Sequence, residues 1–274
     1  MATAEKTKKP TSKKAQPKKV DSKKTASKKP VKADKPETAK ITGKTIAWAV
    51  ALLIWVGIAL YASQFIISFI MIAILGTETV LQPVWSMVFS ALVYILCLFL
   101  VVFVPWRLVK MKTNRDELGL TGLPTWTDIL LSPVGFFVYF ILSALLLGLF
   151  ASILPGIDWN QTQDVGFQNL VLASDKILAF IALVILAPVA EEIIFRGWLY
   201  GKLRGKLPAW LSIILVSVLF GIMHGQWNVA VNVFCMSVVM CLMREITGTI
   251  WSSILLHVIK NGVAFYFLFI NPIV

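Results

Sequence analysis

Residues 177–200 read ILAFIALVILAPVAEEIIFRGWLY, an apolar run that encloses two adjacent glutamates and one arginine. A helix needs about 20 residues to cross the hydrocarbon of a bilayer, and this run is long enough. An ionisable side chain at bilayer depth costs roughly 2.5 to 3.5 kcal/mol on insertion scales, so it requires a partner or a role. The stretch therefore predicts a membrane helix that contributes to an enclosed polar site.

The composition of the whole chain indicates the same class. Hydrophobic residues make up 58% of the sequence and charged residues only 15%, and the mean hydropathy is +0.80. A soluble domain has too little polar surface to cover so many apolar side chains. These values exclude an ordinary soluble enzyme or binding domain.

Apolar runs of spanning length recur along the chain. They lie near 45–74, 84–106, 129–153, 177–200, 208–224, 226–243 and 248–270. We therefore expect an all-α fold, a polytopic transmembrane helix bundle of about seven spans, with six to eight as the range. No internal repeat is visible.

Basic residues alternate between the connectors, as the positive-inside rule requires. The connectors 107–128 and 201–207 carry several Lys and Arg, and Arg244 lies near the next turn. By contrast, 75–83 has no basic residue, and 154–176 has three Asp against one Lys. We expect an integral multi-pass membrane protein with a cytoplasmic N-terminus. The C-terminus then lies outside if seven spans is the correct number.

The first 44 residues differ sharply from the rest. Residues 1–45 hold 15 Lys against 4 Asp or Glu, and they lack both aromatic residues and a periodic apolar face. Ordering such a segment costs entropy without return, so we predict a disordered tail at 1–44 and a helical domain at 45–274. Three roles compete for the tail: a solvated cytoplasmic extension, a polybasic segment attracted to anionic lipid, or a nucleic-acid-binding arm. We expect anionic lipid near the tail and no specific nucleic acid.

The charged residues of the opening stretch fall into two groups. Glu192 and Arg196 are four residues apart, which stacks them on one helix face and allows an ion pair. Glu191 points about 100° away and has no local counter-charge. A carboxylate held without a cation in a low-dielectric site suits a general base. The simpler alternative is that both glutamates neutralise Arg196 or line a polar helix seam.

Further polar residues follow on two later spans. The chain has only two histidines: His224, in the segment FGIMHG, and His257, in the segment HVIKN. His257 and Asn261 are at i and i+4 and share a face. A lone histidine on an apolar helix is more often a hydrogen-bonded packing residue than a catalyst. Two histidines, an amide and a carboxylate pair on neighbouring spans favour a common site instead.

The ordered set Glu-Glu-x-x-x-Arg, Phe-x-x-x-His and His-x-x-x-Asn resembles the CPBP family, the CAAX protease and bacteriocin-processing group that includes the type II CAAX prenyl endopeptidase. The resemblance covers about 177–265. It implies an intramembrane endopeptidase, with a membrane-associated and in some cases lipidated protein or peptide as substrate, in a prokaryotic cell membrane. The positions that carry it are Glu191, Glu192, Arg196, Phe220, His224, His257 and Asn261.

The resemblance also implies roles. Glu191 activates a water, His224 positions that water or shares its proton, and His257 and Asn261 donate to the developing oxyanion. Glu192 and Arg196 hold the helix and the charge balance. Zinc bound through Glu191, His224 and His257 remains an alternative, because these are zinc ligand types. We favour the version without a metal, since Asn261 is a poor zinc ligand and the sequence has no His-Glu-x-x-His segment.

Two other classes of function remain open. Buried Glu and His also build proton relays, so a proton-coupled transporter is the main alternative. A non-enzymatic adaptor or immunity protein could retain the same polar set for packing. One estimate speaks against a common site: at 1.5 Å per residue, Glu191 and His257 each lie roughly 15 Å from their cytoplasmic turns, whereas His224 lies about 25 Å in. Straight, upright helices would keep them apart.

Overall fold

The structure, a computed structural model, describes residues 1, 41–161, 165, 167, 170 and 172–272. Every regular element in these ranges is helical, as the sequence predicts. The predicted tail lies outside the described residues as far as residue 40. The first helix, α1, begins at Gly43, two residues before the predicted start of the helical domain at residue 45.

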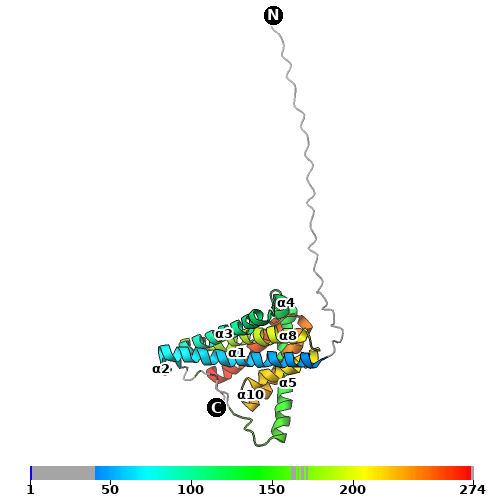
Figure 1. Ribbon diagram of the computed structural model, residues 1–274. Helices are drawn as coiled ribbons and strands as arrows, with labels where there is room; N and C mark the ends of the chain where they lie inside the picture. Colours follow the sequence, from blue (N-terminus) through cyan, green and yellow to red (C-terminus); the bar gives the residue numbers. More distant parts are fainter. Residues whose placement is uncertain (2–40, 162–164, 166, 168–169, 171, 273–274) are drawn as a thin grey trace. The chain divides into compact units, whose positions relative to one another are not determined.

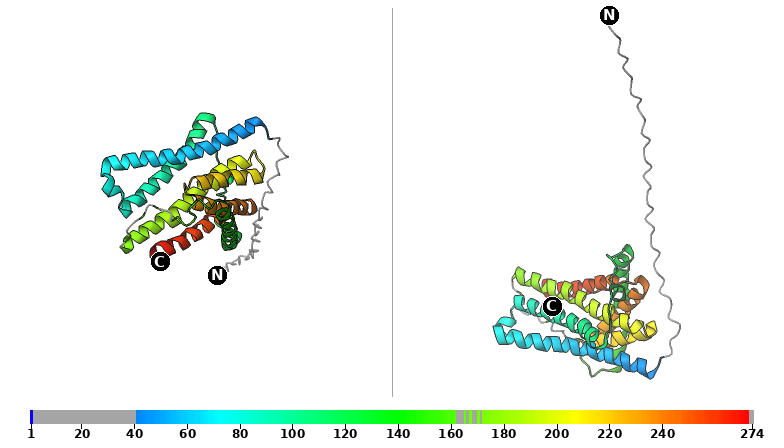
Figure 2. Two further views of the ribbon diagram at one scale, coloured as in Figure 1. Left: turned by 90° about the horizontal axis from the view of Figure 1, so that it is seen from below. Right: turned by 45° about the horizontal axis from the view of Figure 1, so that its top comes forward.

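The first two long helices form an antiparallel hairpin. Helix α1 (Gly43–Leu75) is followed by the single turn α2 (Thr77–Val80) and by α3 (Pro83–Val109). The Thr42 hydroxyl accepts a hydrogen bond from the Thr45 amide at 3.2 Å and so caps the start of α1. Proline is the first residue of α3, where its missing N–H costs nothing. The two helices lie side by side in Figures 1 and 2.

A short connector leads to the third long helix. The turn α4 (Arg115–Leu118) precedes α5 (Trp126–Ile153), which starts with a capping box between Thr125 and Asp128. The second carboxylate oxygen of Asp128 accepts a hydrogen bond of 2.7 Å from the Thr249 hydroxyl. Asp128 therefore fixes the start of α5 to the turn between two later helices.

The opening stretch of the sequence analysis forms the middle of one long helix, Ala173–Arg204. It consists of α6 (Ala173–Phe180), the π-helical η1 (Ile181–Leu186), α7 (Ala187–Glu192), the π-helical η2 (Ile193–Leu199) and α8 (Tyr200–Arg204). In Figure 2, left, this helix (yellow-green to yellow) runs between the hairpin of α1 and α3 and the red C-terminal helix. It carries the Glu-Glu pair at the centre of the domain.

Three helices complete the bundle: α9 (Ala209–Ile222), α10 (Trp227–Thr247) and α11 (Trp251–Phe265), which continues as the π-helical η3 (Tyr266–Ile270). Helix α10 packs against α9, α5 and α11. Half of its most apolar window is buried inside the protein, compared with 17% for α1, α3 and α5. The α10 helix is therefore an inner helix, whereas the other three turn most of their surface outward.

Six of the described helices are long and apolar enough to cross a membrane, and the 14-residue α9 is a shorter apolar helix. Each of the seven predicted runs corresponds to one helix, and the polytopic all-α fold is confirmed. The predicted run 208–224 is the one that falls short of spanning length, because its helix ends at Ile222. Gly225, with φ +71°, turns the chain back into α10.

The predicted basic connectors meet at one end of the bundle. Lys202 forms an ion pair of 2.7 Å with Glu117, and Arg244 donates a hydrogen bond of 3.0 Å to the Gly197 carbonyl and another to the Glu117 carbonyl. A Cβ at Gly201 would lie 2.5 Å from that same carbonyl oxygen, so only glycine allows the connector to approach this closely. The basic connectors, which alternate along the chain, therefore lie at the same end of the helix bundle.

Candidate active site

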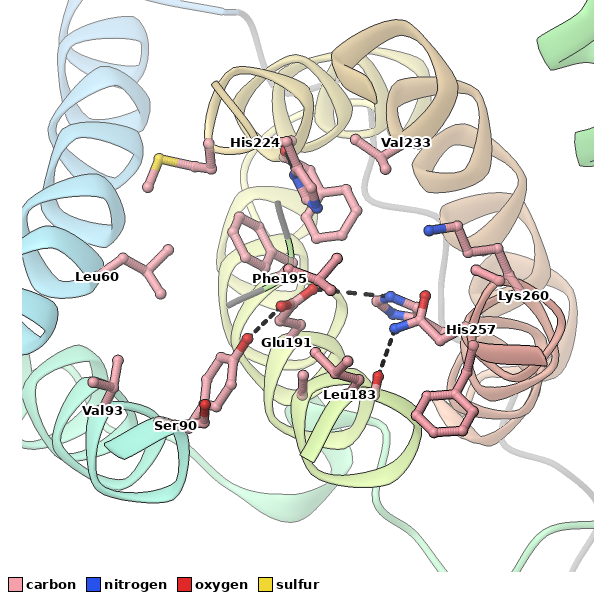
Figure 3. A pocket seen from close by; sticks show the side chains of 18 of the residues that line it. Leu60, Ser90, Val93, Leu183, Glu191, Phe195, His224, Val233, His257 and Lys260 are labelled. Atoms are coloured by element: carbon pink, nitrogen blue, oxygen red, sulfur yellow. Dashed lines mark hydrogen bonds and ion pairs between the residues drawn. The ribbon is translucent and has the colours of Figure 1, made fainter. Parts of the chain in front are cut away.

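A cavity of about 460 Å³ lies between the helix that carries the Glu-Glu pair and helices α1, α3, α9, α10 and α11. Its lining includes Glu191, His224, His257 and Asn261. These four predicted site residues come from three segments that are far apart in the sequence, and the fold brings them to one space (Figure 3).

Glu191 is held at the cavity wall by two neighbours. The Tyr94 hydroxyl of α3 donates a hydrogen bond of 2.5 Å to its Oε1 atom, and the His257 Nε2 atom lies 3.9 Å from its Oε2 atom. The side chain keeps 18% of its surface exposed, so the carboxylate is reachable from the cavity. Among the described residues, His257 is the one potential cation within ion-pair distance of Glu191.

Glu192 is fully buried and lies behind the cavity wall. Its Oε1 atom accepts from Arg196 Nη1 at 2.9 Å, which is the predicted i, i+4 ion pair, and from His257 Nδ1 at 3.0 Å. The Arg196 guanidinium also lies over the Phe220 ring, 4.3 Å from its centroid. Glu192 and Arg196 therefore fix the orientation of His257 and do not line the cavity.

The hydrogen bonds of the two histidines define which ring atoms face the cavity. His224 Nδ1 lies 2.8 Å from the Phe220 carbonyl oxygen, which can only accept, so Nδ1 carries the proton and Nε2 keeps a lone pair in the neutral ring. His257 Nδ1 likewise donates to a carboxylate. In the neutral state, His257 Nε2 is therefore an acceptor, and it becomes a donor only when the ring is doubly protonated.

The depth estimate keeps His224 apart from Glu191 only if the helices are straight and upright, and the contacts of α9 show that they are not. The Phe220 ring of α9 contacts both the Arg196 guanidinium and the Phe195 ring, whose centroid lies 4.9 Å away. The end of α9 therefore lies beside the Glu-Glu segment. Straight, upright helices are incompatible with these contacts, so the helices are tilted or staggered, and His224 lines the same cavity as Glu191.

Asn261 is positioned by a gap in the backbone hydrogen bonds of η1. The Ala187 amide donates to the Ala182 carbonyl, five residues back. In this register the next donor would be residue 188, a proline without an N–H, which leaves the Leu183 carbonyl free. The Asn261 side-chain amide donates to that carbonyl at 2.8 Å. Pro188 thus creates the acceptor that orients Asn261.

The cavity also contains Tyr94 and Lys260, which were not assigned a role from sequence. Tyr94 lies in an apolar span about a hundred residues before Glu191, where a tyrosine is indistinguishable from a packing residue. Lys260 did carry a signal, because a lysine within an apolar run requires a reason. Both line the cavity.

The zinc alternative was tested on the donor set. Within the described part of the chain, no three His, Cys, Asp or Glu side chains are grouped closely enough to hold a metal ion. The Nδ1 atoms of both histidines have protein partners, which leaves the Nε2 atoms as the potential metal donors, as is also usual for zinc-bound histidines. The choice between the metal-free and the zinc-bound version therefore stays a prediction.

Residues 173–263 match a family model described as type II CAAX prenyl endopeptidase Rce1-like. YdiL of Bacillus subtilis (strain 168), which is named as a membrane peptidase, is 27% identical over 184 residues, or 66% of this chain and 69% of YdiL. MroQ of Staphylococcus aureus (strain USA300), named as a membrane-embedded CAAX protease, is 27% identical over 127 residues. These matches support the resemblance to the CPBP family.

The match to MroQ covers 44% of this chain and about half, 51%, of MroQ itself. No solved structure matches the chain. The matched family segment contains the Glu-Glu pair, both histidines and Asn261. Together with the six apolar helices among the described residues, these similarities support a multi-pass membrane protease, and they favour this class over the transporter and the adaptor.

Proposed function

We propose that this protein is an intramembrane endopeptidase in which Glu191 is the general base. The observation that carries the proposal is the common cavity of Glu191, His224, His257 and Asn261 within a bundle of membrane helices. Glu191 is the one carboxylate among the described residues that line this cavity. Transfer of an acyl group to water requires a base and hydrogen-bond donors around one small space.

In the proposed reaction, Glu191 removes a proton from a water whose oxygen attacks the scissile carbonyl. His224 Nε2 accepts a hydrogen bond from that water and orients it. The carbonyl oxygen becomes an oxyanion, which receives hydrogen bonds from Asn261 Nδ2 and from doubly protonated His257 Nε2. The tetrahedral intermediate then collapses, the C–N bond breaks, and Glu191 returns its proton to the leaving amine. A single preorganised oxyanion donor contributes about 3 to 4 kcal/mol to such a step.

Glu192 and Arg196 serve this site indirectly in the proposal. The buried Glu192 carboxylate accepts from His257 Nδ1 and would stabilise the doubly protonated ring, while Arg196 balances the charge of Glu192. Removing one partner of such a buried pair leaves an uncompensated charge and is strongly destabilising.

The proposed substrates are membrane-associated proteins or peptides, lipidated or embedded in the bilayer. The name of MroQ supports a CAAX-type substrate, and bacteriocin-type peptides are the alternative. We further propose that the protein lies in a prokaryotic cell membrane. We propose a cytoplasmic N-terminus, because the basic connectors lie together at one end of the helices. The proposed mechanism contains no metal step, and it is supported by the absence of a group of three His, Cys, Asp or Glu side chains close enough to hold a metal ion among the described residues.

Substitution Glu191→Gln tests the general base. The amide has the shape of the carboxylate but cannot accept the proton of water, so cleavage of a peptide library by the detergent-purified full chain should be lost. Membrane abundance and thermal unfolding should match the wild type. The control is Glu78→Gln, which removes a glutamate of the exposed turn α2 outside the cavity. Equal turnover by Glu191→Gln and the wild type would contradict the proposed role.

A further inference from the structure

Lys260 is a cation inside the candidate active site for which the proposed mechanism has no use. It lies on α11 between His257 and Asn261 and lines the same cavity. Figure 3 shows its side chain extending from the helix toward the space between His224 and His257. Its ammonium group therefore faces the place where a substrate would lie.

No carboxylate of the described residues lies within ion-pair distance of Lys260, and Glu191 acts on it only over a longer distance. Within the described residues, its ammonium forms no ion pair and no hydrogen bond. The carboxylate that lines the cavity, Glu191, is bound by Tyr94 and adjoins His257. The next carboxylate, Glu192, is fully buried and already shared by Arg196 and His257.

The position of Lys260 excludes the usual ways in which a membrane helix accommodates a lysine. Lysines near helix ends extend to the interface, but Lys260 lies ten residues before the end of the helix at Ile270, about 15 Å along its axis. Intramembrane cations otherwise pair with an anion or serve a ligand. Because no carboxylate in the described part of the chain forms an ion pair with Lys260, an anionic ligand is the partner that its position favours.

We propose that Lys260 binds a carboxylate of the substrate close to the scissile bond and so determines specificity. This inference rests on the proposed function. Lys260 precedes Asn261 by one residue and follows His257 by three, so an anion on its ammonium lies next to the proposed oxyanion donors. The carboxylate has two sources with the same chemistry: the free C-terminus of a peptide cleaved near its end, or an Asp or Glu side chain beside the cleavage site.

Matched peptides distinguish these sources. One pair differs only in a free or amidated C-terminus, three residues after the cleaved bond. A second series carries Asp or Asn at each of the three positions on either side of that bond. For the wild type, we expect kcat/KM to favour the carboxylate member of one pair by roughly tenfold to a hundredfold, the scale of a charge-assisted hydrogen bond. In Lys260→Met the ratio of the two kcat/KM values should fall to near one.

The charge-reversed variant Lys260→Glu should prefer Lys over Asp at the identified position. Lys176→Met, which removes a lysine of α6 outside the cavity, should keep the wild-type preference. A preference that survives in Lys260→Met would overturn the proposal. The absence of any carboxylate preference in the wild type would also overturn it. Loss of activity on neutral peptides in Lys260→Met would overturn it as well, because Lys260 would then take part in the chemistry.

Binding separates this inference from the proposed function. The Glu191→Gln variant should bind a fluorescent carboxylate peptide more tightly than its amide, and Glu191→Gln with Lys260→Met should bind both equally. If the wild type cleaves no peptide in a Glu191-dependent manner, the proposed function fails. Even then, binding of the carboxylate peptide that depends on Lys260 would support the anion site. Equal binding of the carboxylate and amide peptides by Glu191→Gln would overturn the anion site.

Discussion

Tyr94 positions the carboxylate on which the proposed reaction depends. It donates a 2.5 Å hydrogen bond to Glu191 from α3, the helix on the opposite wall of the cavity. Charge-assisted hydrogen bonds of this kind contribute about 1.5 to 3 kcal/mol. Tyr94 therefore links the hairpin of α1 and α3 to the catalytic centre.

We expect Tyr94→Phe to lower kcat by about tenfold to a hundredfold, because the carboxylate loses the donor that fixes its direction. KM should change by less than about threefold, since the hydroxyl makes no contact assigned to substrate. Steady-state kinetics on one peptide substrate check this split. Tyr139→Phe is the control, because it removes a hydroxyl that bonds Asn232 outside the cavity. A normal kcat in Tyr94→Phe would show that Glu191 needs no such support.

The two histidines lead to a prediction on metal content. If the site works without a metal, as proposed, active protein should contain far less than one zinc per chain and should retain activity after treatment with a chelator. His224→Ala should lower kcat without changing the metal content. Elemental analysis of purified active protein provides the measurement. One zinc per chain, removed by chelator together with activity, would establish the zinc-bound alternative.

At the scale of elements, the π-helical η1 connects the helix of the Glu-Glu pair to α11. Pro188 leaves the Leu183 carbonyl without a backbone donor, and Asn261 takes its place. A proline inside a helix is usually a defect in the hydrogen-bond ladder. Here the missing N–H gives a side chain of another helix a fixed direction.

We expect Pro188→Ala to lower kcat by about threefold to tenfold, because its new N–H competes with Asn261 for the Leu183 carbonyl and one hydrogen bond contributes about 1 kcal/mol. Asn261→Ala should cost more, about a hundredfold, as a lost oxyanion donor. In the Asn261→Ala background, Pro188→Ala should have no further effect on kcat. Pro133→Ala in α5 is the control. Additive losses in the double variant would contradict the coupling.

The positions of the helices could be predicted from the sequence, but the register of their backbone hydrogen bonds could not. The run 177–200 corresponds to Ala173–Arg204, and 208–224 to Ala209–Ile222, because apolar length alone marks a membrane helix. Hydropathy does not distinguish i, i+4 from i, i+5 hydrogen bonds, so η1 and η2 were not anticipated. The motif residues were found by their chemistry and order. Tyr94 could not be recognised in this way, because its contact with Glu191 depends on the packing of α3 against the helix of the Glu-Glu pair.

At the scale of the whole molecule, the basic N-terminus and the catalytic domain are predicted to act separately. Among the described residues, the cavity lining begins at Leu60. Segments with this charge density are attracted to anionic membrane surfaces at about 1 kcal/mol per nearby Lys. The tail would then set where the protein lies on the membrane, without taking part in the reaction.

We expect deletion of residues 2–40 to leave kcat on a short peptide in detergent within about twofold of the full chain. A synthetic peptide of residues 1–40 should associate with vesicles that contain anionic lipid, and added salt should weaken this association because screening shortens the reach of its charge. Vesicles of neutral lipid are the control. Loss of peptide cleavage in the shortened chain would mean that the division at residue 44 is wrong.

The 14-residue length of α9 also has a consequence for the surrounding lipid. Such a helix covers about 21 Å, whereas the hydrocarbon of a typical bilayer is about 30 Å thick. The turn after α9 carries His224 and non-helical backbone up to Gln226, groups that hydrocarbon cannot solvate. Lipid tails beside this turn must thin to relieve the hydrophobic mismatch. The resulting dimple would let bulk water approach the cavity from the side opposite the basic connectors, and so supply the reagent that hydrolysis consumes.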